Sequence, residues 1–207
     1  MRDGPARTVS ERLVCHTGPM SAPPELPAVV ARAFDVSRRA GYVSFCRNET
    51  GRLLATLAAT RGGVMAEFGT GCGVGTAWLR SGVRPGTAIL SAELDPKLAR
   101  AAAEIFVDDP QVDVLEADWS TLRDKGPYSL LFLDPSVPED ASPEAVADLV
   151  EPGGIVVLDD FTPCELWPPI TYGRVDTFRE GWLTDERFTA VEVMVAGDAS
   201  AIIATRR

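Results

Sequence analysis

Short apolar runs alternate with stretches of helical periodicity between residues 63 and 160, and this alternation constrains the fold more than any other feature. The apolar runs, which we expect to be strands, read GVMAEFG, TAILSAEL, VDVLEAD, YSLLFLD and GIVVLDD. The helical stretches between them read TAWLRSG, PKLARAAAEIFV and SPEAVADLV. Right-handed crossovers join strands in such an arrangement, and helices cover both faces of the sheet. The pattern therefore predicts an α/β fold with a mostly parallel sheet.

The C-terminal stretch RFTAVEVMVAGDASAIIATRR departs from this alternation. Two strand-like runs meet at Gly197-Asp198 with no helix between them. A hairpin places its second strand antiparallel to the first, so we expect the sheet to end in a mixed edge.

The chain upstream of the alternating region divides into two parts. Residues 1–27 are rich in Pro, Ser and Gly and lack periodicity, which is typical of a flexible N-terminal arm. Apolar spacing then indicates one helix from Ala28 to Arg39 and a second in ETGRLLATLAATR. A chain of 207 residues can bury one sizeable core, so we expect a single domain over residues 28–207.

Composition excludes several classes of partner. The formal net charge of −10 and the scattered basic residues argue against nucleic acid and anionic membranes as partners. The sequence shows neither a signal peptide nor an apolar run long enough to span a membrane. Cys15, Cys46, Cys72 and Cys164 lie far apart and His16 is the one histidine, which argues against zinc and disulfides. We therefore expect a cytoplasmic protein with free thiols.

The stretch EFGTGCGVG follows an expected strand and precedes an expected helix. Its candidate ligand-binding residues are Gly69, Thr70, Gly71, Gly73 and Gly75. Glycines at such a turn let backbone N–H groups approach a ligand closely. The pyrophosphate-binding turn of nicotinamide-dependent enzymes has similar glycines, so the turn alone does not identify the ligand.

Acidic residues at the strand ends favour one ligand. Glu67 would crowd a pyrophosphate, but it can hold a cationic amino group or order the loop. Glu93 is placed to accept hydrogen bonds from both hydroxyls of a ribose, and Asp118 to accept one from an adenine amino group. An amino acid, a ribose and an adenine in that order describe S-adenosylmethionine. Ala117 and Trp119 complete the expected adenine side, where Trp119 either stacks on the base or closes the core. The structural alternative is a set of turn glycines and helix-capping carboxylates.

These motifs give the chain a specific resemblance. It resembles class I S-adenosylmethionine-dependent methyltransferases, and among them it is similar to the catechol and caffeoyl-coenzyme A O-methyltransferases. The matching segments read YVSFCRNETGRLLATLAA, AEFGTGCGVGTAWL, SAELDPKLARAA, EADWSTL, YSLLFLD, VEPGGIVVLDD and AIIATRR. The resemblance implies a Rossmann-like three-layer sandwich with a seven-stranded, mostly parallel sheet and an antiparallel last strand. It also implies that Val43 and Ser44 contact the methionine end of the cofactor, and that a homodimer forms.

Carboxylates also end two consecutive strands, Asp134 after YSLLFL and Asp159-Asp160 after GIVVL. Oxygen ligands of this kind suit Mg²⁺ or another hard cation, which can deprotonate a substrate hydroxyl. The resemblance implies a divalent metal at Asp134, Asp159 and Asp160, with Asp134 also contacting the cofactor. In the family the third ligand is usually asparagine, and a lysine after the first ligand assists proton removal. Here the third residue is Asp160 and the stretch LDPSVPEDAS has no lysine.

Structural roles compete with these assignments. Asp134 before Pro135 can start a turn, and Asp159-Asp160 can end a strand or cap a helix. The sequence DPSV is also a weak match to the Asp/Asn-Pro-Pro-aromatic loop of N-methyltransferases.

The segment FTPCELWPPITYGRVD has the position of a substrate lid, in which Phe161, Trp167 and Tyr172 can line an apolar pocket or simply pack. Cys72, inside the glycine loop, is expected to be a neutral filler, because no histidine lies near it in the sequence.

The sequence thus predicts a methyltransferase that transfers a methyl group to a small hydroxylated, aromatic acceptor, with Asp134 and Asp159 as catalytic residues. The alternatives are a metal-independent methyltransferase, a non-catalytic relative that binds the cofactor, and a nicotinamide-dependent oxidoreductase.

Overall fold

The computed structural model describes residues 25–134 and 141–207 of the chain. Most of the expected N-terminal arm, and the residues after Asp134 that lack the family's lysine, lie outside the described residues. The arm and the domain limits stay predictions. Of the helices within the described ranges, none is long and apolar enough to cross a membrane.

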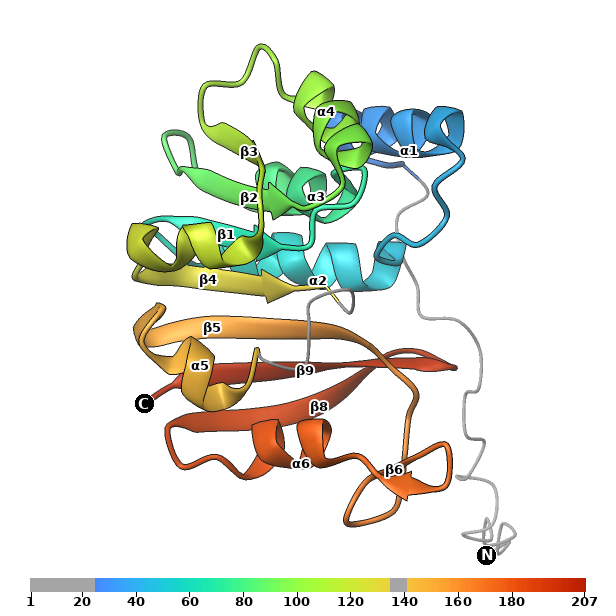
Figure 1. Cartoon of the computed structure of the whole chain (residues 1–207), viewed down its shortest axis with the longest axis vertical. Coiled ribbons are helices and arrows are strands. Elements are labelled where there is room, and N and C mark those ends of the chain that lie inside the picture. Colours follow the sequence, from blue (N-terminus) through green and yellow to red (C-terminus); the bar gives the residue numbers. More distant parts are fainter. Residues whose placement is uncertain (1–24, 135–140) are drawn as a thin grey trace, which may run out of the picture.

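A seven-stranded sheet forms the centre of the molecule, in the order β3-β2-β1-β4-β5-β9-β8 (Figure 1). Its strands are β1 (Met65–Phe68), β2 (Ile89–Glu93), β3 (Val112–Glu116), β4 (Tyr128–Leu133), β5 (Val150–Phe161), β8 (Phe188–Ala196) and β9 (Ala199–Arg206). The first five pair in parallel, whereas β9 is antiparallel to both β5 and β8. The predicted fold class is confirmed, and the reversed last strand lies one place inside the edge strand β8.

Helices cover both faces of the sheet, as the alternation requires (Figure 1). One face packs against α1 (Ala28–Ala40), α2 (Asn48–Ala59), α3 (Val74–Gly82) and α4 (Pro96–Ile105). The other packs against the 3₁₀ helix η2 (Trp119–Lys125), α5 (Pro143–Ala147) and α6 (Thr177–Thr184). All six residues of β4 are buried, which explains why its sequence is a continuous apolar run rather than an alternating one.

Local sequence signals set several helix limits. The Asp95 side chain accepts hydrogen bonds from the backbone N–H groups of Lys97 and Leu98, and Pro96 occupies the first turn of α4. At the end of α1, Gly41 adopts a left-handed conformation with φ 69°, which is the common C-terminal stop of a helix.

The Pro-rich connection after β5 holds structure that the sequence did not predict. It contains a two-stranded ribbon, β6 (Ile170–Thr171) with β7 (Arg174–Val175), and then α6. Asp176 caps α6 by accepting a hydrogen bond from the N–H of Arg179 at 3.0 Å. The helix is short, and its buried residues are Arg179 and Trp182. Its apolar pattern is therefore too brief to predict a helix from the sequence, and three prolines precede it in the same connection.

Candidate functional site

The glycine loop between β1 and α3 excludes side chains for steric reasons. A Cβ atom on Gly71, where φ is 53°, would lie 2.8 Å from the ring of Tyr42. A Cβ atom on Gly75 would lie 2.0 Å from Glu67 Oε1 and 2.8 Å from the ring of Phe132. The loop therefore has bare backbone where it passes over the end of β1, as the sequence predicted.

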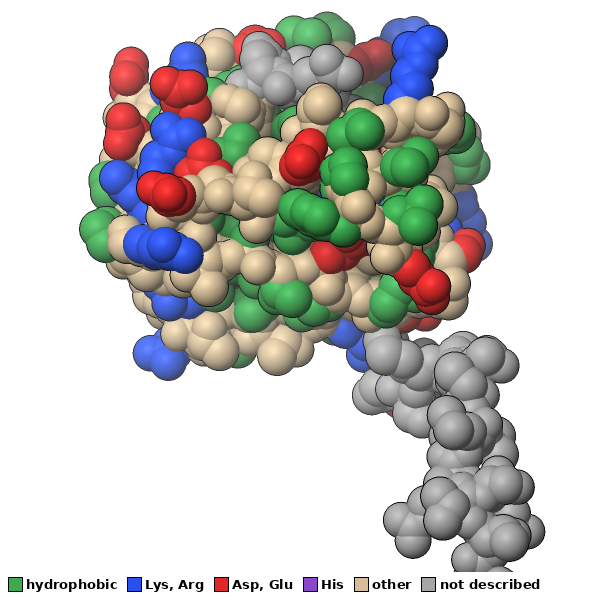
Figure 2. All heavy atoms as spheres, turned by 90° about the horizontal axis from the view of Figure 1, so that it is seen from below, with side chains coloured by type: hydrophobic (Ala, Val, Ile, Leu, Met, Phe, Trp, Pro, Cys, Tyr) green, Lys and Arg blue, Asp and Glu red, His purple; other side chains and the backbone are tan. Residues whose placement is uncertain are grey.

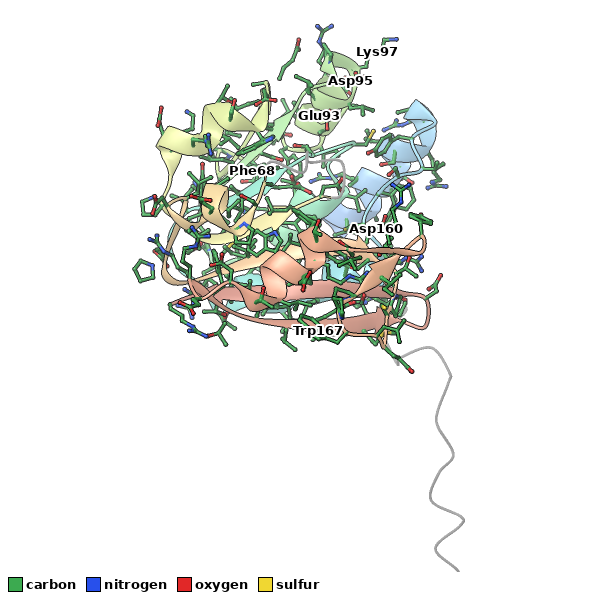
Figure 3. All side chains as sticks on the ribbon, turned by 60° about the horizontal axis from the view of Figure 1, so that its bottom comes forward. Phe68, Glu93, Asp95, Lys97, Asp160 and Trp167 are labelled. Atoms are coloured by element: carbon green, nitrogen blue, oxygen red, sulfur yellow. The ribbon has the colours of Figure 1, made fainter. Side chains whose placement is uncertain are left out.

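Glu93 joins this loop to the end of β2. Its Oε2 accepts a hydrogen bond from the N–H of Gly71 at 2.7 Å, and its Oε1 accepts one from the N–H of Asp95 at 2.8 Å. Glu93 and Asp95 lie together where β2 passes into α4 (Figure 3). Each carboxylate oxygen keeps further acceptor capacity, so the two ribose hydroxyls expected from the sequence can still be accommodated.

Glu67 lies buried beneath the loop, with 1% of its surface exposed. Its Oε2 accepts hydrogen bonds from the hydroxyls of Thr76 and, at 3.3 Å, Ser91. Burial raises the pKa of Glu67 to about 8, and the hydrogen bonds from Thr76 and Ser91 only partly oppose this shift. These contacts are those of a residue that orders the loop, which was one of the two roles expected for it. Thr70 joins the same network through the hydroxyl of Ser91.

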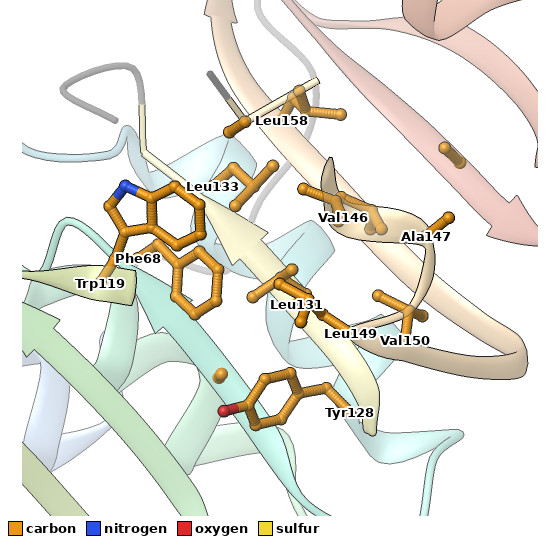
Figure 4. Packing of buried hydrophobic residues seen from close by; sticks show 14 of the residues in the cluster. Phe68, Trp119, Tyr128, Leu131, Leu133, Val146, Ala147, Leu149, Val150 and Leu158 are labelled. Carbon is orange, nitrogen blue, oxygen red and sulfur yellow. The ribbon is translucent and has the colours of Figure 1, made fainter. Parts of the chain in front are cut away.

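The expected adenine side is built around structural contacts. Asp118 is exposed and caps η2, because its Oδ1 accepts a hydrogen bond from the N–H of Ser120 at 2.9 Å. This bonding lowers the pKa of Asp118. Trp119 is buried and stacks on Phe68, with the ring centres 5.0 Å apart (Figure 4). The N–H of Ala117 bonds to the carbonyl oxygen of Glu93 at 3.0 Å, so this segment adjoins the end of β2.

A cavity of about 330 Å³ lies at the ends of β4 and β5. The residues that line it are Val43, Ser44, Phe45, Cys46, Arg47, Asp134, Asp159 and Asp160. Five of these were predicted from the sequence as cofactor-binding, catalytic or metal-binding residues. The structure therefore brings the segment before α2 together with the carboxylates of two neighbouring strands.

The carboxylates in this cavity differ in their surroundings. Asp159 is 8% exposed, its Oδ1 accepts a hydrogen bond from Thr50 Oγ1 at 2.9 Å, and burial raises its pKa. Asp160 is exposed and has a left-handed backbone with φ 67°, which turns the chain at the end of the strand. In the described parts of the chain, no three His, Cys, Asp or Glu side chains are grouped so that they could hold a metal ion. The predicted divalent site is therefore not supported, although all three carboxylates line one cavity.

Sequence reasoning missed several residues of this cavity. Arg47 and Cys46 line it, and Thr50 binds Asp159. All three lie in the quoted segment YVSFCRNETG, from which only Val43 and Ser44 were selected. The spacing would have been the signal, since Arg47 and Thr50 are three residues apart at the start of a helix and so lie on one face of it.

The expected lid does not close over this cavity. Trp167 is 63% exposed and Tyr172 is fully exposed, so neither lines the cavity, and Figure 3 shows Trp167 well separated from Glu93 and Phe68. Apolar side chains instead gather on the outer face at the β6 end of the molecule (Figure 2). Phe161 packs under the guanidinium of Arg179, 5.0 Å from its ring centre. Cys72 is buried, and burial raises the pKa of its thiol, which agrees with the filler role expected for it.

Comparisons with known proteins agree with this geometry. Residues 66–161 match the methyltransferase domain family. The chain is 31% identical over 166 residues to the Mycobacterium tuberculosis protein named "Probable O-methyltransferase Rv1220c", covering 74% of this chain and 71% of that protein.

Solved structures share the fold. One is the O-methyltransferase from Bacillus cereus in complex with SAH, with a TM-score of 0.68, 18% identity, and coverage of 88% of this chain and 92% of that one. Another is the O-methyltransferase TomG from Streptomyces achromogenes in complex with SAM, with a TM-score of 0.68, 19% identity and the same 88% and 92% coverage. The glycine loop, the acidic strand ends and the mycobacterial relatives thus place this chain in the O-methyltransferase family.

Proposed function

We propose that the protein is an S-adenosylmethionine-dependent O-methyltransferase that acts on a small hydroxylated, aromatic acceptor. The observation that carries the proposal is the bond between Glu93 and the N–H of Gly71, at the same sheet edge as the cavity lined by Asp134 and Asp159. One half of this edge suits a nucleoside with an amino acid tail, and the other suits a small polar acceptor. Family membership disfavours a nicotinamide-dependent oxidoreductase.

The residues present fit the cofactor. The bare backbone of the glycine loop leaves room for a ligand above β1, and Glu93 offers acceptor oxygens for a ribose. Asp118 and Trp119 would lie on the adenine side, and Val43 and Ser44 on the methionine side. When bound, S-adenosylmethionine supplies a methyl group on a sulfonium centre that already carries its leaving group. The complexes of the two structural neighbours with SAH and SAM support the same cofactor here.

The tasks left to the chain are alignment of the acceptor and removal of its proton. Alignment matters most, because two reactants that are already held in line no longer lose translational and rotational entropy in the reaction step. Asp134 and Asp159 are the candidate proton acceptors in the cavity. The raised pKa of Asp159 makes it a stronger base than an exposed aspartate. Both tasks are assigned to side chains that line the cavity.

Calorimetric titration with S-adenosylmethionine tests the cofactor half. Glu93→Ala should weaken binding about 10–100-fold, the effect of losing charge-assisted hydrogen bonds. Glu104→Ala, at an exposed position on α4, is the matched control and should bind as the wild type does. Unchanged affinity of Glu93→Ala would overturn the assignment of the cofactor site.

Methyl transfer to a panel of catechols and phenols, followed by mass spectrometry, tests the reaction. The expected product is larger than the acceptor by one methylene group. Tight cofactor binding with no product from any acceptor would instead identify a non-catalytic relative.

A further inference from the structure

Arg47 brings a positive charge to the acceptor cavity. It directly precedes α2, and its Nη1 and Nη2 donate hydrogen bonds to the two carboxylate oxygens of Asp198 at 2.8 and 3.2 Å. Asp198 lies in the turn between β8 and β9. The guanidinium is thus held in a defined fork geometry at the rim of the cavity, and its side chain remains 44% exposed to incoming ligands.

Arg47 brings the positive charge to a cavity whose other charged lining residues are acidic. Among the described residues that line it, Arg47 is the one basic residue beside three aspartates. The hydrogen bonding that Arg47 donates to Asp198 raises the pKa of Arg47, and the charges of Asp160 and Asp159 raise it further. The guanidinium therefore stays charged at neutral pH.

The same turn of α2 also engages one of the predicted metal ligands. Thr50, three residues after Arg47, donates its hydroxyl hydrogen bond to Asp159. Asp159 is thus buried and already accepts a hydrogen bond. The described residues contain no group of three side chains that could hold a metal ion. Asp159 is thus held by the first turn of α2, next to Arg47.

We propose that Arg47 takes the part of a divalent cation in this cavity, so that the acceptor binds as an oxyanion facing the guanidinium and no metal is required. This inference rests on the proposed function. The hydroxyl proton passes to a carboxylate of the cavity, the freed oxygen pair forms the O–C bond to the methyl carbon, and the electron pair of the broken S–C bond stays on sulfur. Arg47 contributes by stabilising the anionic oxygen before its charge is lost.

Binding of 4-nitrocatechol tests this role without requiring turnover, because its visible spectrum reports whether the bound phenol is ionised. The titration uses the full-length protein with S-adenosylhomocysteine, in EDTA, over a range of pH. The wild type should bind the anion at a pH where free 4-nitrocatechol is mostly neutral. Arg47→Met should move the ionisation midpoint up by about 1–2 pH units and lower kcat about 10–100-fold, as loss of a charge-assisted bond would. Arg47→Lys should recover part of both.

Two further variants separate this role from a structural one. Asp198→Asn frees the guanidinium from its ion pair but keeps the charge, so the bound phenol should stay ionised. Arg84→Met removes an exposed arginine elsewhere and should match the wild type. If Asp198→Asn reproduces the loss seen in Arg47→Met, then Arg47 serves only to tie the β8–β9 turn and the proposal is wrong.

Other outcomes also decide the matter. Anionic binding that disappears in EDTA and returns with Mg²⁺, or no binding of 4-nitrocatechol to the wild type, would overturn the role of Arg47. Failure of the proposed function shows differently, as an absence of S-adenosylmethionine binding in calorimetry. If only the role of Arg47 is wrong, the protein still binds S-adenosylmethionine, and the spectrum of 4-nitrocatechol alone departs from the expected result.

Discussion

The two halves of the candidate site are built in different ways. The glycine loop is held by residues close in sequence, since Glu67 and Glu93 lie within 9 and 22 residues of their partners Thr76 and Gly71. The acceptor cavity is held by distant ones, since Thr50 bonds to Asp159 across 109 residues and Arg47 to Asp198 across 151. A local network can keep one geometry while the rest of the chain varies. The cavity instead depends on how β5 and the β8–β9 turn lie against the start of α2.

The largest expected effect concerns Glu67 in the local half. Burial raises the pKa of its carboxyl from 4.5 to about 8, so the folded state binds a proton that the unfolded state releases. The contribution of Glu67 to the free energy of unfolding should therefore be fully present below pH 4.5 and should be lost as the pH rises to about 8. The total loss should be about 2–5 kcal/mol. Urea unfolding at several pH values measures the slope. Glu67→Gln should flatten it, and an unchanged slope would contradict the assignment.

Gly75 gives the next largest effect, because a methyl group there meets buried atoms. Gly75→Ala should destabilise the fold by about 1–3 kcal/mol and weaken cofactor binding, since Glu67 must move to make room. Thermal unfolding and calorimetry measure the two effects. Gly181→Ala on α6, where a Cβ atom meets nothing within 4 Å, should be neutral or stabilising. Equal melting temperatures for the two variants would refute the packing shown at Gly75.

The same contrast explains which features the sequence could predict. Strands, crossovers, the glycine loop and Glu93 follow from periodicity and spacing within short windows. The roles of Arg47 and Thr50 depend on which strand end reaches the start of α2, and no short window contains that information. The metal prediction stays unsupported, because the described residues include no group of three His, Cys, Asp or Glu side chains that could hold an ion. Three carboxylates at neighbouring strand ends do meet in one cavity, where Asp159 accepts a hydrogen bond from Thr50 and Asp160 has a left-handed backbone. The sequence left two roles open for Trp119, stacking on the adenine or packing in the core, and its stacking on Phe68 agrees with the packing role.

A pair of isosteric variants should separate the two halves. Glu93→Gln should weaken S-adenosylmethionine binding about 10-fold, because a neutral amide accepts weaker hydrogen bonds. Asp159→Asn should leave cofactor affinity nearly unchanged and lower kcat about 10–100-fold, because a proton acceptor is lost. Calorimetry and single-turnover rates measure the two quantities. Matching losses of affinity in both variants would show that the halves are not independent.

The smallest expected effect comes from Thr50→Val, which removes one hydroxyl and keeps the shape of the side chain. The cost to the free energy of unfolding should be about 1 kcal/mol, the usual net worth of one hydrogen bond. The functional consequence is more informative. The Thr50 bond lowers the pKa of Asp159 against the raising effect of burial, so its removal should raise that pKa further. If Asp159 accepts the acceptor proton, the acidic limb of the kcat profile should move to higher pH, whereas a structural Asp159 would leave the limb in place. Cofactor affinity should stay unchanged in either case, because the hydroxyl lies in the half of the site that distant segments build.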